Sequence, residues 1–422
     1  MRPTVRFIFL LATVTGVVMA LGDLGAASGS SAQCSAGPTE PSLELTYRLE
    51  AGTKRVTPST RRTATGIVCK RLLTILGADG QVQLLTHKRI RVLLSNVRDA
   101  RHAKRAATQI GEAGRLYFYD WEQNLIGPER KIGGHPGTVP PATALRKANH
   151  EWRAAGRSTR LLANAQLISA GAFPDVYGAV RLASEQKPRK RCAACSASAP
   201  RFYMFDRSPT HELIAGPFSA RAELRNAVGQ RHRHNDIMLK VPVGTTIVSE
   251  HPSSRTGEIL MTAEPGWFAL RDSPALDGAD IVSPHQEVDE VGQPDVTFGF
   301  TAQGRVAFKR LTRKIAKRGR ASAIGPVDGS GAEALSGHLA TVFDSEVKTR
   351  PIINFADFPN GIDGHTGAQI SGGFPNIRAA QDFVNILKIG GLPINMGLLS
   401  QRMLRNRYGR TQSSTPSSAA NE

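Results

Sequence analysis

The sequence predicts an α+β protein with two or three compact regions. Short segments in which apolar and polar residues alternate, as they do in strands, lie between segments whose apolar residues recur at helical spacing. Stretches rich in glycine and proline separate these groups of elements. With 422 residues, of which 40% are hydrophobic and 6% aromatic, the chain is long and apolar enough to bury more than one core.

The first part of the chain predicts six elements in a characteristic order. Leu43–Leu49 alternates as a strand does, and Thr57-Pro58 begins a helix that ends at Gly77. Two short strands, a second helix and an aromatic strand follow at Gln81–Thr86, Arg89–Leu94, Val97–Ile110 and Gly114–Glu122. The order strand, helix, strand, strand, helix, strand is that of a ferredoxin-like unit.

The later part of the chain predicts that this unit is completed from the far end of the sequence. Residues 337–400 contain strand-like segments and one helix, but the stretch is small for a separate core. We therefore expect a ferredoxin-like base built from both ends of the chain, with an inserted α+β head subdomain. The expected segments are 1–32, a signal peptide or N-terminal membrane anchor; 40–128, the first part of the base; 129–141, a linker; 142–336, the head subdomain; 337–400, the second part of the base; and 401–422, a disordered tail.

The N-terminus predicts export across a membrane. Arg2 and Arg6 precede a mostly apolar, uncharged run, Phe7–Leu21, and small residues follow it. The run is shorter than the about 20 residues that span a bilayer, but it reaches that length if it continues to Ala27. The segment is therefore either a cleaved signal or a retained anchor. We expect the rest of the chain on the outer side of the cell membrane, held by this anchor, or secreted.

The charge of the chain favours an acidic partner. Lys and Arg number 54 against 35 Asp and Glu, a net charge of +19. Because an exported protein rarely meets nucleic acid, we expect none as a partner. One predicted helix, 303–318, carries basic residues and no acidic one, and its basic face is interpreted either as a solvated surface or as a dedicated anion site. Its core-facing positions are expected to be Val306, Phe308, Leu311 and Ile315.

Four cysteines enter an oxidising compartment if the chain is exported. Cys192 and Cys195 form a CxxC motif after several basic residues, which lower thiol pKa values, so the pair is interpreted either as a local disulfide or as the active site of a thiol-disulfide oxidoreductase. A single CxxC supplies half of a zinc site at most, and we expect no metal. Cys69 falls among helical positions, and we expect it to pack in the core.

A glycine pair lies in the segment GAQISGGFPN, Gly367–Asn376. A P-loop would need a lysine and a hydroxyl residue after its second glycine, but Gly373 and Phe374 occupy those places. A dinucleotide fingerprint would need three spaced glycines. We therefore interpret Gly372 and Gly373 as residues of a sharp turn from a strand into a helix, and we expect no cofactor.

Six segments carry a family resemblance. They are YFYDWEQNLIGP (117–128), PALDGADIVSP (274–284), VTFGFTAQGRVAFKRLT (296–312), GHLATVFDSEVKTRPIINF (337–355), GAQISGGF (367–374) and LKIGGLPINM (387–396). In this order they resemble the first extracytoplasmic domain of SecD, a subunit of the Sec protein-export translocase. The resemblance covers most of residues 43–400 and implies the base-and-head fold described above.

The resemblance also assigns motif residues and has three departures, one of which is that the LRSGALP-like segment of the family reads LKIGGLP at Leu387–Pro393. The residues that match the family motif, all with a structural role, are Gln369, Ile370, Ser371, Gly372, Gly373, Phe374, Leu392 and Pro393. The glycine-rich stretch that usually follows the first membrane helix of the family is not reproduced in GAASGSSAQCSAGP. No bundle of membrane helices follows Ser400, so no residue is assigned a proton-carrying role.

The resemblance implies a function without catalysis. We expect a SecD-like component or accessory of the Sec translocase that binds unfolded preproteins on the outer side of the cytoplasmic membrane, with no catalytic residues. The expected partners are the SecY complex, SecF, full-length SecD and preproteins, with base and head moving across Gly127–Pro141 and Ala323–Gly337. The alternatives are the secreted thiol-disulfide oxidoreductase, and a basic module that binds anionic cell-wall polymer or lipid.

Overall fold

The structure is a computed structural model of the chain. It describes residues 31–34, 41–77, 79–127, 172–189, 192, 195–228, 236–250, 266–290, 292–322, 332–333, 335–371 and 373–404. Most of the predicted N-terminal segment, the predicted linker 129–141 and the predicted tail beyond residue 404 lie outside the described residues.

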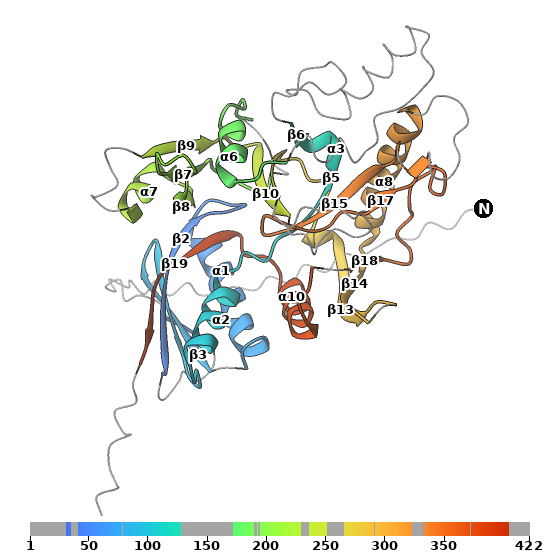
Figure 1. Cartoon of the computed structure of the whole chain (residues 1–422). Helices are drawn as coiled ribbons and strands as arrows, with labels where there is room; N and C mark the ends of the chain where they lie inside the picture. The colour runs from blue at the N-terminus through green and yellow to red at the C-terminus, as the bar shows by residue number, and fades with distance from the viewer. Residues whose placement is uncertain are drawn as a thin grey trace, which may run out of the picture.

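One five-stranded antiparallel sheet forms the base (Figure 1). Its strand order is β1-β3-β4-β2-β19, and two helices cover one face. Without β1, the order is that of a ferredoxin-like fold whose fourth strand comes from the far end of the chain. The elements are β1 (Ser31–Gln33), β2 (Leu43–Ala51), α1 (Pro58–Thr74), β3 (Gly80–Thr86), β4 (Arg89–Leu94), α2 (Ala100–Gly111) and β19 (Ile394–Met403).

Local sequence explains why these base elements form. In β2 the alternate residues Leu43, Leu45 and Tyr47 are fully buried under the helices. Helix α1 begins at a capping box in which Thr57 and Thr60 each bind the other's backbone N–H, which satisfies two donors that the first helical turn leaves free. The two sequence signals that predicted these elements therefore correspond to stabilising contacts. Alternation corresponds to the buried side chains of β2, and the capping residues to the first hydrogen bonds of α1.

A second sheet contains the strand that the sequence assigned to the end of the ferredoxin-like unit. β5 (Leu116–Asp120) pairs with β12 and β15, not with a base strand, so the prediction that Gly114–Glu122 completes the base sheet is wrong. The physical reason is burial on both faces: Phe118 packs in one core and Tyr119 in another. The base sheet has helices on one face, and a strand of this composition would expose half of its aromatic residues there.

The second sheet has eight strands in the order β12-β5-β15-β16-β10-β11-β6, with β17 paired to β15. β10 and β16 are parallel, and the other pairs are antiparallel. Of the segment 337–400, only β19 joins the base sheet, and the domain boundaries remain a prediction. The elements are α3 (Trp121–Asn124), β6 (Leu125–Ile126), β10 (Thr245–Glu250), β11 (Gly266–Arg271), β12 (Leu276–Asp277), β15 (Gly337–Phe343), β16 (Glu346–Thr349) and β17 (Ile352–Ile353).

Two three-stranded sheets complete the described fold. One has the order β13-β14-β18 and packs against α10, and the other has the order β8-β7-β9 and packs against α6 and α7. The first group comprises η2 (Gly278–Asp280), β13 (Ile281–Val288), β14 (Pro294–Phe300), α8 (Ala302–Ser322), β18 (Ala368–Ser371) and α10 (Ile377–Ile389). The second comprises α6 (Val176–Ser184), β7 (Arg201–Phe205), β8 (Leu213–Phe218), α7 (Arg221–Val228) and β9 (Ile237–Val241).

The core face of α8 differs from the prediction at one position. Phe308, Leu311 and Ile315 are buried as expected, whereas Val306 is 59% exposed. Residues 308, 311 and 315 follow helical spacing, and Val306 lies two positions before Phe308, on a different side of the helix. The predicted fold class, an α+β protein with a ferredoxin-like base drawn from both ends of the chain, is confirmed.

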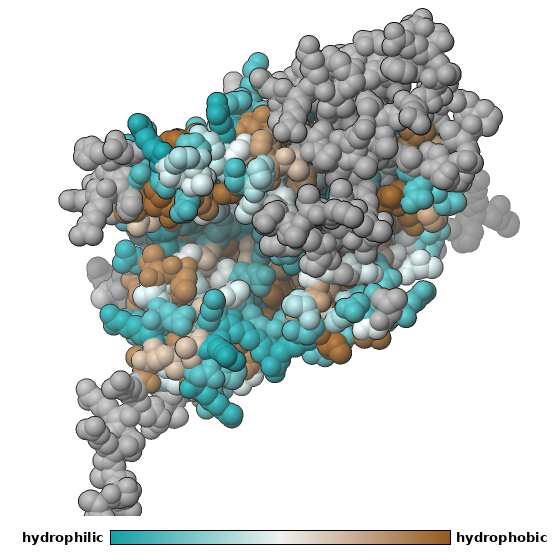
Figure 2. Space-filling view, viewed as in Figure 1, coloured by the Kyte–Doolittle hydropathy of each residue, from teal (hydrophilic) through white to brown (hydrophobic). Residues whose placement is uncertain are grey.

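The described surface is mixed in character. Figure 2 shows apolar residues scattered in small groups among polar ones on the face viewed. Within the part of the chain that the structure describes, every helix is too short or too polar to span a lipid bilayer.

Candidate functional site between α2 and α10

The motif segment Gln369–Phe374 begins as the edge strand of the β13-β14-β18 sheet. The Gln369 side-chain amide donates to the carboxylate of Asp295 on β14, and Ile370 is fully buried opposite Val296. Ser371 is paired in register with Asp295, at the end of the ladder. The motif therefore fixes where β18 ends.

The chain then turns into α10. Gly372 lies outside the described residues, and Gly373 has φ of 77°, a left-handed conformation that favours glycine. Phe374 is 9% exposed and packs edge-to-face on Phe383 of α10, with ring centroids 5.2 Å apart. Asn376 caps α10 by accepting a hydrogen bond from the N–H of Ala379. Gly373 therefore lies between β18 and α10 in a conformation that favours glycine, and the structural role of the whole motif remains a prediction.

Phe374 also lines a groove between α2 of the base and α10. The groove has a volume of about 490 Å³. Its aromatic and aliphatic lining consists of Phe343, Phe374, Pro375, Ala379, Phe383 and Ile386. Charged residues at its rim are Arg101, Lys104, Arg105, Glu112, Lys348 and Asp382. Sequence reasoning did not locate this groove, because its two walls come from helices almost 300 residues apart, joined by the Arg105–Asp382 contact at a separation of 277.

An ion pair closes one side of the groove. Arg105 of α2 donates both to Oδ1 and to Oδ2 of Asp382 on α10, at 2.9 and 2.8 Å. Gln109, one helical turn further along α2, donates to Oδ2 of Asp382 at 2.6 Å. These contacts set the spacing of the two helices, so the width of the groove depends on the side chain of Asp382.

Leu392 and Pro393 lie where the chain returns from α10 to the base. The N–H of Leu392 donates to the carbonyl of Ala113 at 2.7 Å, and Nε of Arg115 donates to the carbonyl of Leu392 at 2.8 Å. The carbonyl of Pro393 accepts from the N–H of Lys54 at 2.9 Å. This half of the motif therefore joins the returning strand to two other segments of the base.

The chain leaves the base sheet after α2 and returns to it after α10. Its two passages are residues 112–115 and 390–393, and neither is a predicted linker. We expect motion across Gly127–Pro141 and Ala323–Gly337; most residues of both stretches lie outside the described residues, so this expectation remains a prediction.

A buried carboxylate and a buried arginine hold the first passage. Asp344, in the left-handed turn between β15 and β16, accepts from the N–H of Gly114 at 2.7 Å and of Arg115 at 2.9 Å. Burial raises the pKa of Asp344, while these N–H groups and Arg115 act to lower it. Arg71 of α1, fully buried, donates to carbonyls at the end of α2 and beyond: Gln109 (3.2 Å), Ile110 (3.3 Å), Glu112, Ala113 (3.4 Å) and Gly390 (3.5 Å).

Two carboxylates ten positions apart in sequence have opposite pKa shifts. Burial and the neighbouring Asp344 raise the pKa of Glu112 to about 7, against the opposing effect of Arg71. Burial acts to raise the pKa of Glu122 as well, but His338 and Arg318 beside it lower the pKa to about 2. The Glu122 carboxylate lies 2.6 Å from Nδ1 of His338 and 3.4 Å from Arg318.

Arg318 also forms two hydrogen bonds with Asp120, at 2.5 and 2.8 Å. This buried cluster attaches the end of α8 to β5 and α3. Sequence reasoning missed the cluster, although a signal was present: Asp120 interrupts the aromatic run Tyr117–Trp121, and Glu122 follows it directly.

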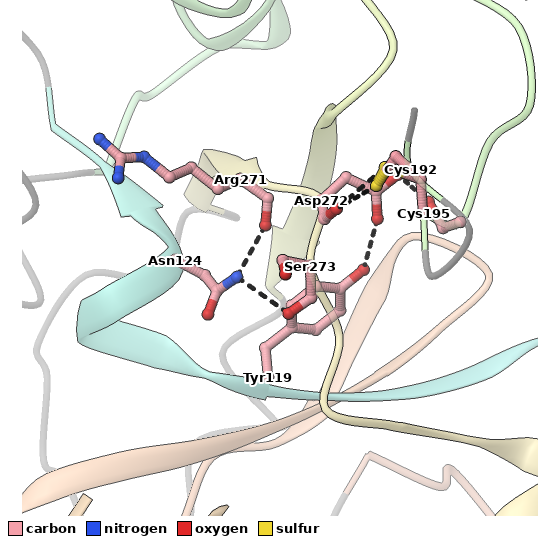
Figure 3. Close-up of a disulfide and its surroundings, with 8 residues drawn as sticks. Tyr119, Asn124, Cys192, Cys195, Arg271, Asp272 and Ser273 are labelled. Atoms are coloured by element: carbon pink, nitrogen blue, oxygen red, sulfur yellow. Dashed lines mark hydrogen bonds between the residues drawn. A yellow bond between two sulfur atoms is a disulfide. The ribbon is translucent and has the colours of Figure 1, made fainter. Parts of the chain in front are cut away.

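The CxxC cysteines form a disulfide in the structure (Figure 3). Cys195 is 7% exposed, and its sulfur lies 3.1 Å from the carbonyl oxygen of Asp272, at the end of β11. The buried carboxylate of Asp272 accepts from the hydroxyls of Tyr119 (3.1 Å) and Ser196 (2.9 Å). The disulfide therefore holds its loop against the second sheet, where burial limits access of another thiol to Cys195.

The other two cysteines are also bonded. Cys34 and Cys69 form a disulfide with a sequence separation of 35, so the expectation that Cys69 only packs in the core is wrong. The pairing of β1 with β3 brings Cys34 next to α1, a contact that helical spacing around Cys69 alone does not reveal. Among the described residues, no group of three or more His, Cys, Asp or Glu side chains is arranged to hold a metal ion.

The described geometry defines a class of protein. It has a ferredoxin-like base whose last strand, β19, follows an inserted α+β region in the sequence. Residues 256–394 match the family model described as "SecDF, P1 head subdomain". The chain therefore carries a SecD-type extracytoplasmic domain, and the resemblance that the sequence motifs indicated is confirmed.

Curated relatives and a solved structure extend the comparison. The protein translocase subunit SecD of Aquifex aeolicus is 26% identical over 145 residues, 34% of this chain and 23% of that protein. The subunit SecDF of Thermus thermophilus is 28% identical over 138 residues, 32% of this chain and 15% of that protein. A crystal structure of SecDF in a super-membrane-facing form aligns with 87% of this chain and 32% of its own, at 17% identity and a TM-score of 0.41. The matched region is thus less than a quarter of either relative.

Proposed function

We propose that this chain is a component or accessory of the Sec translocase that binds unfolded preproteins on the outer side of the cytoplasmic membrane. The match to the SecDF head subdomain and the names of the relatives, protein translocase subunits, support a role in protein export. The observation that carries preprotein binding is the groove between α2 and α10, which contains the family-motif residue Phe374.

The groove has the chemistry that capture of an unfolded segment requires. Aromatic and aliphatic side chains line it, and an unfolded chain exposes apolar side chains that gain free energy when they leave water. Charged rim residues such as Lys104 and Lys348 can interact with carboxylates and carbonyls of a bound segment. Binding of this kind needs no reacting group, so the proposed activity is capture without catalysis or cofactor.

The proposed partners are those of a translocase accessory: the SecY complex, SecF, full-length SecD and the preprotein in transit. The proposed location is the outer side of the cytoplasmic membrane, with the N-terminal segment as an anchor or a cleaved signal. The buried position of Cys195 gives no support to an oxidoreductase.

Site-specific crosslinking tests the groove. A photoreactive residue at Lys104, on the rim, should crosslink to an unfolded preprotein, whereas the same residue at Lys70 should not, because Lys70 lies on the exposed face of α1 outside the groove. Ala379→Trp, which fills the groove, should abolish the Lys104 crosslink. Equal crosslinking from positions 70 and 104, unaffected by the tryptophan, would rule out the groove as the binding site.

A further inference from the structure

A second cavity, about 420 Å³ in volume, lies between α8 and the end of β11. Four basic residues from three separate segments line it: Arg189, Arg271, Arg310 and Lys314. The amides of Gln123 and Asn124 and the residue Ser273 add polar lining. The cavity is distinct from the groove at Phe374, with which it shares no lining residue.

Arg189 is fixed in place by the turn before β10. Its backbone N–H donates to the carbonyl of Val243 at 2.9 Å. Its side-chain stem lies on Gly244, where an added Cβ would be only 2.7 Å from Cγ of Arg189. Gly244 has φ of 95°, so both its conformation and the close contact require glycine.

The backbone of Arg271 is held by the side chain of Asn124. The Asn124 amide donates to the carbonyl of Arg271 at 2.8 Å and to that of Ser273 at 3.2 Å, and Figure 3 shows the Arg271 side chain extending away from the disulfide. Burial and the nearby charge of Arg189 lower the pKa of Arg271. The two guanidinium groups are therefore close enough to repel each other.

The third segment that lines the cavity is the basic face of α8. Arg310, Lys314 and Arg318 follow one another at intervals of four residues and share a side of the helix. Arg318 is neutralised by Asp120, the carboxylate that also lines the cavity. Among the residues that the structure describes, no carboxylate forms an ion pair with Arg310, Lys314, Arg189 or Arg271.

We propose that this cavity binds a phosphate group, carried by a small molecule or by a lipid headgroup. Convergence of four cations on one cavity costs electrostatic free energy unless an anion is present. Arginine forks and a lysine ammonium match the tetrahedral oxygens of phosphate, with charge-assisted hydrogen bonds. Of the exposed basic residues of α8, Arg310 and Lys314 line the cavity, whereas Arg313 and Lys317 do not, and this site is independent of preprotein capture.

Calorimetric titration of the whole protein with inorganic phosphate at low salt tests the site. Arg310→Gln with Lys314→Gln should weaken binding about tenfold or more, because two of the four cations are removed. The matched control, Arg313→Gln with Lys317→Gln, removes the same charge from exposed positions of the same helix outside the cavity and should leave the affinity unchanged. The thermal unfolding midpoint of each variant without phosphate reports whether it is folded.

Vesicle sedimentation separates the two sources of phosphate. Binding to phosphatidylglycerol vesicles that is lost in the Arg310/Lys314 variant and kept in the Arg313/Lys317 variant identifies a lipid headgroup. Binding of inorganic phosphate with no difference between the variants on vesicles identifies a small phosphorylated molecule. The proposal is overturned if phosphate has no more effect than chloride at equal ionic strength, or if both double variants lose the same affinity.

Discussion

The base and the second sheet both bury arginine, but different groups compensate the charge. In the base core Arg71 binds backbone carbonyls near the end of α2, which its last helical turn leaves without partners. At the second sheet, Arg318 of α8 binds Asp120 of β5, and Arg350 binds Glu250 of β10 at 2.9 Å with its guanidinium over the Trp121 ring. Both kinds of contact join segments that are distant in sequence: Arg71 and Gln109 are separated by 38 residues, and Arg318 and Asp120 by 198. The comparison teaches that neutral backbone carbonyls bind the buried Arg71, whereas carboxylates with a full opposite charge bind Arg318 and Arg350.

Removal of the α8 arginine that binds the second sheet should have the largest effect on stability. Arg318→Met leaves Asp120 and Glu122 buried with less positive charge, and we expect a loss of about 3–5 kcal/mol in the free energy of unfolding. Urea unfolding measures it. Arg320→Met, on the exposed face of the same helix, is the matched control and should change the stability little. Equal effects of the two substitutions would contradict the role of the buried cluster.

The next largest effect is expected from removal of a disulfide, and the two disulfides should differ in their contribution to stability. In the chain-entropy account, removal of the Cys34–Cys69 bond, with a sequence separation of 35, should cost about 3–4 kcal/mol, and removal of Cys192–Cys195, with a separation of 3, about 2 kcal/mol. The paired Cys→Ser variants, compared by urea unfolding, give the two values. A larger loss for the short loop would show that its contacts with Asp272 outweigh chain entropy.

Removal of Arg71, the arginine bound by backbone carbonyls, should reduce the stability less. Arg71→Met keeps most of the side-chain volume but leaves several carbonyls unsatisfied, for an expected loss of about 2–3 kcal/mol. Hydrogen exchange should locate the change at the C-terminal half of α2. Lys70→Met, at the neighbouring exposed position of α1, is the control. A loss of stability as large as that of Arg318→Met would contradict the expected difference between an arginine bound by carbonyls and one bound by carboxylates.

The smallest effect concerns Glu112, and it depends on pH. Because its folded-state pKa is raised to about 7, the folded state resists ionisation, and its contribution to stability falls as pH rises from about 4.5 to 7. Glu112→Gln removes this penalty and should stabilise the protein by about 1–2 kcal/mol at pH 8, with little change at pH 4. Glu185→Gln, on the exposed end of α6, is the control. A pH-independent effect of Glu112→Gln would contradict the raised pKa.

The sequence predicted the local elements of the base well. The predicted strand Arg89–Leu94 matches β4, and the helix predicted from Pro58 matches α1, because alternation and capping are local signals. The sheet to which β5 belongs was predicted wrongly, since strand pairing depends on residues such as Leu339 that lie far away in sequence. Family motifs identified Phe374 as important, but a groove formed by two distant helices has no signature along the chain.

The position of β19 sets an order for the synthesis of this protein. β2 is complete in the first 51 residues, but its partner strand begins at residue 394, and the Asn395 amide reaches the carbonyl of Ala51 across a separation of 344. A growing chain therefore carries β2 with one edge unpaired until nearly all of the inserted region has been made. Such an edge can pair with another chain, so a nascent molecule is most vulnerable to aggregation during translation of residues 52–393.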